Sequence, residues 1–180
     1  MRTQFFVAAL FVFCLPALAQ KPNSENQKLI STTSFIAEAG GAGIAFSATI
    51  DKRFAQSHVG FGGRIGLGFV SADEPVYSPT YGYDYNTKSA LTIPIQLNYI
   101  FGKSNSPHCL EVGAGVTYVT KKLEIMNFYD DLATQVFGTL AFMYRRQPVN
   151  GGFSWRVGFT PIFGKSYIQP FGAASVGYNF

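Results

Sequence analysis

Thiols, imidazoles and charged groups are scarce in this 180-residue chain. It has two cysteines, two histidines and one tryptophan, and charged residues make up only 13% of it. Cys14 lies in a predicted leader, so Cys109 remains as a lone thiol and no intramolecular disulfide can form. Neither His58 nor His108 stands at a metal-ligand spacing from a cysteine. These scarcities exclude a disulfide scaffold and a zinc module, and we expect no metal and no cofactor.

Long apolar runs are also missing. No stretch reaches the roughly 18 residues that a membrane-spanning helix needs. The longest run, 5–18, follows Arg2 and ends in small residues that suit signal-peptidase cleavage before Gln20. We predict a cleaved signal peptide over 1–19, because Pro16 and the short core disfavour an uncleaved helical anchor. Residues 20–31 are polar and aperiodic, and are predicted to form a flexible lead-in.

The charge balance is nearly even. The chain has 14 basic and 10 acidic residues, and the predicted signal peptide removes only Arg2, which lowers the net charge from +4 to +3. A charge this small and dispersed does not favour a nucleic-acid partner.

What the chain has instead is alternation of apolar with small or polar residues. The last ten residues show it most clearly, with Tyr178 and Val176 on one face and Asn179 and Ser175 on the other. This strand ends on the aromatic Phe180. A soluble protein seldom leaves such an edge open, whereas the closing strand of a transmembrane barrel has both edges paired. Tyr178 and Phe180 therefore resemble the C-terminal signal that the outer-membrane assembly machinery recognises.

Eight segments with this alternation follow one another, separated by turn residues. They cover residues 33–41, 43–55, 58–70, 88–101, 108–120, 133–147, 152–163 and 168–180. We predict an all-β fold, an eight-stranded antiparallel up-and-down transmembrane β-barrel over residues 32–180.

The lengths of the connections predict the orientation of this barrel. Long connections at 71–87 and 119–132 alternate with short turns at 55–57, 102–107 and 148–151. Outer-membrane barrels have long loops outside and short turns in the periplasm, so both termini are expected in the periplasm. The first external turn, 40–43, is unusually tight. Pro94 lies mid-strand, where its missing N–H predicts a bulge or kink.

The two faces of each strand differ in bulk. In segment 58–70, Phe61, Ile65 and Leu67 alternate with Gly62 and Gly66. A soluble barrel would place its apolar face inward, but glycine suits a narrow lumen and bulky side chains suit lipid. The aromatic residues near the predicted periplasmic ends also fall on the outward face, as an interfacial girdle would. They are Phe54, Phe61, Tyr99, Phe101, Tyr144, Phe153, Trp155, Tyr178 and Phe180.

Several stretches resemble the small outer-membrane β-barrel proteins of Bacteroidota, distant relatives of the OmpA and OmpX barrels. These stretches are residues 37–41, 51–54, 91–99, 110–115, 144–146, 156–161 and the terminal strand. The resemblance covers residues 33–180. It implies the barrel fold and no particular activity.

Charged residues at inward positions are the first candidate site. By parity, three acids and four arginines point into the lumen, and together we call them the lumen charge network: Glu38, Asp51, Arg53, Arg64, Glu111, Arg145 and Arg156. Side chains can fill an eight-stranded barrel, so a salt-bridge plug is favoured over an ion pathway. We expect Glu38 to pair with Arg156, Arg64 or both.

The connection 71–87 is the second candidate site. It combines tyrosines with acids, a composition suited to binding an extracellular protein or glycan, although an ordinary polar hairpin would look the same. The candidate residues are Tyr77, Tyr81, Tyr83, Asp84 and Tyr85. His58 and His108 both fall at predicted periplasmic turns and are interpreted as solvated turn residues, without the serine or acid of a catalytic group.

These features favour a structural or surface-interaction protein of the outer membrane of a Gram-negative bacterium, without enzymatic activity. A narrow channel for ions or small solutes is the alternative, and a lipid-modifying or proteolytic barrel enzyme ranks third. The expected partners are outer-membrane lipid and lipopolysaccharide, with the barrel-assembly machinery during biogenesis. We expect a monomer.

Overall fold

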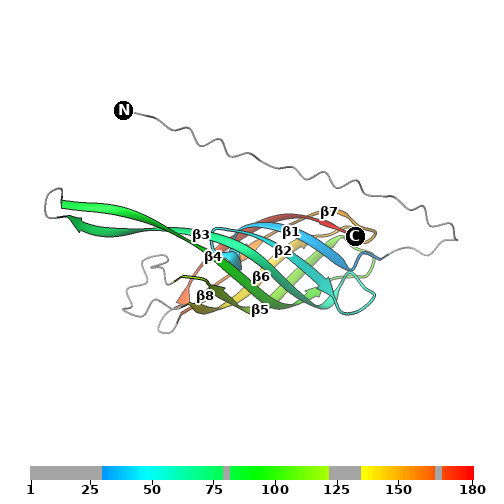
Figure 1. Cartoon of the computed structure of the whole chain (residues 1–180). Coiled ribbons are helices and arrows are strands. Elements are labelled where there is room, and N and C mark those ends of the chain that lie inside the picture. The colour runs from blue at the N-terminus through cyan, green and yellow to red at the C-terminus, as the bar shows by residue number, and fades with distance from the viewer. Residues whose placement is uncertain (1–29, 79–81, 122–134, 165–167) are drawn as a thin grey trace, which may run out of the picture.

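Alternating side chains build a closed sheet of antiparallel strands (Figure 1). The computed structural model describes residues 30–78, 82–121, 135–164 and 168–180, with the backbone alone for 72–78 and 83–86. The elements are β1 (Thr33–Gly40), η1 (Gly41–Gly43), β2 (Phe46–Arg53), β3 (Gly60–Ser78), β4 (Gly82–Phe101), β5 (His108–Val119), β6 (Val136–Arg146), β7 (Gly152–Phe159), β8 (Ile162–Phe163), β9 (Ile168–Gln169) and β10 (Gly172–Asn179).

The sheet closes on itself, which confirms the predicted eight-stranded antiparallel barrel. β1 pairs with β10 from Ser34–Asn179 to Gly40–Ala173, and β5 pairs with β6. Every pairing in the register is antiparallel. Closure gives the barrel strands a partner on both sides, so the wall has no free edge.

Ten strand segments form eight strands because two strands are interrupted by prolines. β7 and β8 keep one register against β6 across Pro161, whose carbonyl accepts a hydrogen bond from the Leu140 N–H at 3.0 Å. β9 and β10 flank Pro170, beside a bond from the Thr160 N–H to the Phe171 carbonyl at 2.6 Å. A proline removes one donor and leaves the strand direction unchanged. The predicted segments 152–163 and 168–180 each span such an interrupted strand.

The predicted loop 71–87 is wrong over most of its length. β3 continues to Ser78 and β4 begins at Gly82, with Tyr77 opposite Tyr83 in the register. Figure 1 shows the resulting two-stranded ribbon extending well past the end of the barrel. Valine and tyrosine have high strand propensity, and this outweighs the proline and glycine that predicted a loop.

At Pro94, where the sequence predicts a bulge or kink, the structure has no bulge. The register between β3 and β4 is the same at Ile65–Ile95 and at Gly68–Thr92, so no extra residue is inserted. Between these points, two residue pairs are missing from the β3–β4 ladder. On its other side Pro94 stays paired with Thr117 of β5. The proline therefore interrupts one side of the ladder without shifting it.

The first turn does not lie outside the barrel as predicted. Residues 40–45, which we call the inward turn, carry η1, and β2 begins only at Phe46. Gly41, Ala42 and Gly43 are buried, and Figure 1 shows η1 among the strands of the barrel. Gly40, Gly41 and Ile44 have φ of 75°, 69° and 75°. Glycine adopts this left-handed region without penalty, and the glycine run therefore lets the chain reverse inward.

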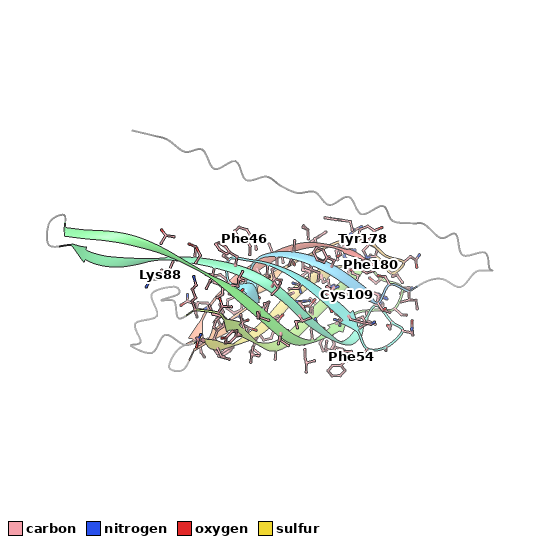
Figure 2. All side chains as sticks on the ribbon, viewed as in Figure 1. Phe46, Phe54, Lys88, Cys109, Tyr178 and Phe180 are labelled. Atoms are coloured by element: carbon pink, nitrogen blue, oxygen red, sulfur yellow. The ribbon has the colours of Figure 1, made fainter. Side chains whose placement is uncertain are left out.

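The two faces of the wall divide as the sequence predicts. Leu67 and Leu97 are 63% exposed on the outside, whereas Arg64 is 4% exposed inside. Figure 2 shows Phe46, Phe54, Tyr178 and Phe180 at the outer surface. No helix among the described residues is long and apolar enough to cross a membrane.

Ser31, the last residue of the predicted lead-in 20–31, contacts the barrel. Ser31 is buried, its N–H donates to the Val149 carbonyl at 3.3 Å, and its hydroxyl donates to the Phe180 carbonyl at 3.2 Å. Residues 20–29 and the predicted signal peptide lie outside the described residues. These bonds hold the start of the barrel beside its last strand.

Closure of the sheet predicts resistance to detergent. The refolded chain should migrate differently on an SDS gel before and after boiling, because the continuous ladder of hydrogen bonds keeps the barrel folded in cold SDS. A variant that lacks residues 172–180 cannot close the sheet and should migrate at one position under both conditions. A full-length chain that shows one position, or a helical circular dichroism spectrum, would contradict this fold.

Candidate functional site in the barrel lumen

The structure buries all seven residues of the lumen charge network. Their exposed fractions lie between 1% and 7%. They come from β1, β2, β3, β5, β6 and β7, and the inward parity of each strand brings them to one level of the lumen. Charges this deep are stable only when they are paired and hydrogen-bonded, and the geometry shows how each is matched.

Glu111 accepts hydrogen bonds from three arginines. Its Oε1 lies 2.7 Å from Arg64 Nη2 and 2.7 Å from Arg156 Nη1, and its Oε2 lies 2.9 Å from Arg145 Nη1. A single carboxylate on β5 therefore accepts hydrogen bonds from strands β3, β6 and β7. The bonds to Arg64 and Arg156 join strands that are not neighbours in the sheet, whereas Arg145 comes from β6, which pairs with β5.

Asp51 on β2 shares two of the same arginines. Its Oδ2 lies 2.9 Å from Arg64 Nη2 and 2.7 Å from Arg145 Nη1, while its Oδ1 pairs with Arg53. Asp51 and Glu111 thus hold Arg64 and Arg145 from both sides. This four-residue centre ties β2, β3, β5 and β6 together.

Glu38 and Arg53 lie at the ends of the network. Glu38 pairs with Arg156, as expected, and no bond joins it to Arg64 among the described residues. The Arg156 Nε also donates to the Ser175 hydroxyl at 2.8 Å. Arg53 Nη1 donates a hydrogen bond to the Gly60 carbonyl at 2.9 Å. This bond satisfies a guanidinium N–H, because the four-residue centre has no further acid to pair with it. Four arginines against three acids leave one positive charge in excess.

Neutral polar residues complete the network, and the sequence analysis did not select them. Gln96 accepts from Arg64 Nη1 at 3.3 Å and donates to Thr139 at 3.1 Å. Ser34 accepts from Arg145 Nη2 at 3.0 Å and donates to Asn179 at 2.5 Å. All of them share inward parity with the charges, and that signal could have found them. With them, every strand of the closed barrel contributes to the network.

The inward turn forms a second barrier across the lumen, in addition to the lumen charge network. Ile44 packs in an apolar cluster with Val70, Ala90, Val119, Phe137 and Ile162, which Phe171 contacts from the side. The Thr92 hydroxyl donates to the Gly43 carbonyl at 3.0 Å, and the Thr117 hydroxyl to the Ala42 carbonyl at 2.8 Å. These bonds satisfy turn carbonyls that water would otherwise have to reach.

The inward turn also touches the network. A Cβ on Gly41 would collide with the Glu38 carboxylate and contact the Ala173 side chain at 3.0 Å. Glycine at this position therefore lets the backbone lie directly over the Glu38–Arg156 pair. The lumen is thus filled by an ionic layer with an apolar layer next to it.

The other predicted residues lie away from the lumen. Tyr178 and Phe180 are 59% and 65% exposed on the outer face. Tyr77, Tyr83, Asp84 and Tyr85 belong to the β3–β4 ribbon, where only the backbone is described. Tyr81 lies outside the described residues.

One histidine prediction is wrong. His58 is not solvated: it is 1% exposed, and its Nε2 lies 3.3 Å from the Ser106 carbonyl. It stands in a turn, as predicted, but the neighbouring turn 102–107 covers it. His108 is exposed, and its Nδ1 lies 2.5 Å from the Tyr144 hydroxyl. No three His, Cys, Asp or Glu side chains in the described part of the chain are grouped as metal ligands would be.

Comparison with known proteins supports the fold alone. No protein-family model matches the chain, and no curated protein does. The structure is similar to the crystal structure of the N-terminal β-barrel domain of Pseudomonas aeruginosa OprF, with a TM-score of 0.52 and 11% identity over 84% of this chain and 98% of that one. The chain therefore shares the fold of this β-barrel domain.

The number of ionic partners predicts a graded loss of stability. Glu111→Gln leaves three arginines without their shared carboxylate, whereas Glu38→Gln leaves one, Arg156. Breaking a buried pair costs about 3–5 kcal/mol, so both variants should lower the free energy of unfolding in urea, and Glu111→Gln should lower it more. Lys52→Gln, which removes an exposed charge, is the control and should change little. Equal urea midpoints for Glu111→Gln and the wild type would refute the network as a stabilising element.

Proposed function

We propose that the protein is an integral outer-membrane barrel of structural or surface-interaction type, with a closed lumen and no catalytic role. One observation supports this proposal most strongly: the protein is inverted, with charges buried inside and large apolar side chains outside. A water-soluble protein seldom exposes a continuous apolar face of this extent, but a lipid bilayer covers one. The resemblance to barrels of Bacteroidota stays a sequence-based expectation.

Aromatic pairs at one end of the barrel support a membrane interface there. Phe61 and Tyr99 have ring centroids 4.7 Å apart, and Tyr99 and Phe101 4.4 Å. Tyr144 and Trp155 are 5.3 Å apart at the same end. We place this end in the periplasm, because it has the short turns and the last residue of β10, while the β3–β4 ribbon extends from the other end. Lipid and lipopolysaccharide would then be the neighbours of the wall.

The C-terminal strand supports the proposed route of assembly. Phe180 exchanges backbone hydrogen bonds with Thr33 at 2.9 and 3.2 Å and exposes its ring. Tyr178 exposes its ring two residues earlier. We infer that the barrel-assembly machinery recognises this aromatic edge before β1 pairs with it. A closed wall needs no second copy, which favours a monomer.

The β3–β4 ribbon is the proposed surface for an extracellular protein or glycan. Its tyrosines and acids are carried beyond the wall on two paired strands, as the register from Ser71–Ser89 to Ser78–Gly82 shows. The two histidines lie at the opposite end of the barrel, beside the short turns. Because an enzyme acting on external lipid would need its catalytic groups at the ribbon end, their placement supports a non-enzymatic role.

A narrow ion channel is the second candidate, and unpaired polar atoms in the lumen favour it. The Ser47 and Thr49 hydroxyls, Arg64 Nε and Arg145 Nε are buried without a hydrogen-bond partner within the described residues. Buried polar atoms of this kind are commonly satisfied by water. Conductance through such a path would require displacement of the inward turn.

Planar-bilayer recordings distinguish the two candidates. The wild type should show no steady conductance, and Gly41→Val should raise it, because a branched side chain at φ 69° collides with Glu38 and expels the inward turn. Gly82→Val is the control: Gly82 also has positive φ, at 80°, but nothing lies within 4 Å of its Cβ position. Steady wild-type conductance at the level of Gly41→Val would overturn the closed lumen and favour the channel.

Membrane insertion predicts that stability depends on depth. Ile95 is 48% exposed on the outer face, midway along the wall portion of β4. Ile95→Arg should lower the free energy of unfolding from lipid vesicles by about 2–4 kcal/mol, because the guanidinium must leave water for hydrocarbon. Val136→Arg, at the end of β6, should cost about 0–1 kcal/mol, as expected near an interface. If both substitutions have the same effect, the apolar face does not span a bilayer.

A further inference from the structure

The outer wall carries a pocket at the end with the short turns. Its volume is about 520 Å³, and it lies where the turn between β4 and β5 meets β6. Apolar and polar residues both line it, notably Phe101, Lys103, Ser106, His108, Leu110 and Tyr144. None of these belongs to the lumen charge network. The pocket therefore faces the surroundings of the barrel and not its interior.

The pocket is built on a turn held by several hydrogen bonds. The Ser106 N–H donates to the Lys103 carbonyl at 3.0 Å, and the His108 N–H donates to the Ser106 hydroxyl at 3.2 Å. The Gln147 N–H donates to the Pro107 carbonyl at 2.8 Å, which fixes the turn to the end of β6. The buried His58 contacts the same turn, with its Nε2 3.3 Å from the Ser106 carbonyl. A site this constrained is formed before a ligand arrives.

The polar side of the pocket has the ammonium group of Lys103 and the imidazole of His108. Lys103 is exposed, and His108 stands beside it with only its Nδ1 engaged, by Tyr144. Arg146 is the register partner of His108 on β6 and lies next to the pocket. The acids whose side chains the structure describes, Glu38, Asp51 and Glu111, are all in the lumen, so none of them neutralises this group.

The apolar side of the pocket continues the outer face of the wall. Leu110 and Phe101 are 61% and 52% exposed, and Tyr144 extends the surface to Trp155 at 5.3 Å between ring centroids. Hydrogen-bond donors beside aromatic side chains, above an apolar surface, match the polar headgroup and the acyl chain of a membrane lipid. The donors suit a phosphate oxygen, and the wall suits an acyl chain.

We propose that this pocket binds the phosphodiester headgroup of an anionic glycerophospholipid, with Lys103 and His108 on the phosphate and an acyl chain along Leu110 and Phe101. The Tyr144 hydroxyl is a positioning group that fixes the imidazole ring of His108. The inference rests on the proposed membrane location and adds a specific lipid site to it.

Native mass spectrometry of the full chain, refolded in detergent, tests the site with two lipids of equal chain length. The wild type should retain phosphatidylglycerol in preference to phosphatidylcholine. Lys103→Gln and His108→Gln should each weaken this retention by on the order of fivefold, about the effect of one basic residue at an anionic surface. Tyr144→Phe should weaken it less, since the ring stays and only the hydroxyl that orients His108 is lost.

Lys52→Gln provides the matched control. It removes the same charge from an exposed position on β2, outside the pocket, and should leave retention unchanged. Loss of retention equal to that of Lys103→Gln would show a general charge effect and overturn the site, as would unchanged retention in Lys103→Gln and His108→Gln. Displacement of the lipid by millimolar inorganic phosphate would mean a site for free phosphate instead. The shift on boiling, measured on each sample, reports separately whether the barrel itself has folded.

Discussion

Two buried carboxylates in the lumen, Asp51 and Glu111, hold the guanidinium groups of Arg64 and Arg145 between them, and the barrel depends on this arrangement. Hydrogen bonds between neighbouring strands close the wall, but they join each strand only to the next one. The pairs Asp51–Arg145, Glu111–Arg64 and Glu111–Arg156 join strands that do not pair with each other in the wall. These charges occupy much of the interior, where a soluble protein has its hydrophobic core.

The ionic layer requires protection from water, and the inward turn supplies it. Ile44 brings an apolar side chain into the lumen next to the charges, and Val70, Ala90 and Val119 receive it. The turn backbone would be poorly satisfied there without the Thr92 and Thr117 hydroxyls. The polar and apolar layers thus depend on each other. The apolar layer closes the lumen, and the polar layer supports the turn that carries Ile44.

Parity made the wall and the lumen predictable from sequence. A period of two assigns Arg64 and Leu67 to opposite faces whatever the neighbouring strand does, so the buried charges could be identified before their partners. Partner choice needed the register, which alternation does not encode. Parity also places Gln96 and Ser34 inside, but it does not say which inward polar residue contacts which charge. Ile44 could not be predicted to enter the lumen, because a glycine-rich turn permits reversal in either direction. Residues 71–87 were predicted as a loop because they contain proline and glycine, but the strand propensity of their tyrosines outweighs this signal.

The β3–β4 ribbon has a consequence for how the sheet meets its surroundings. Beyond Val70 and before Leu91 the two strands pair in the register only with each other, within the described residues. Each strand of the wall lies between two others, whereas each strand of this projection has a sheet neighbour on one side. An extended segment of another polypeptide can add to such an edge by backbone hydrogen bonds alone, whatever its side chains.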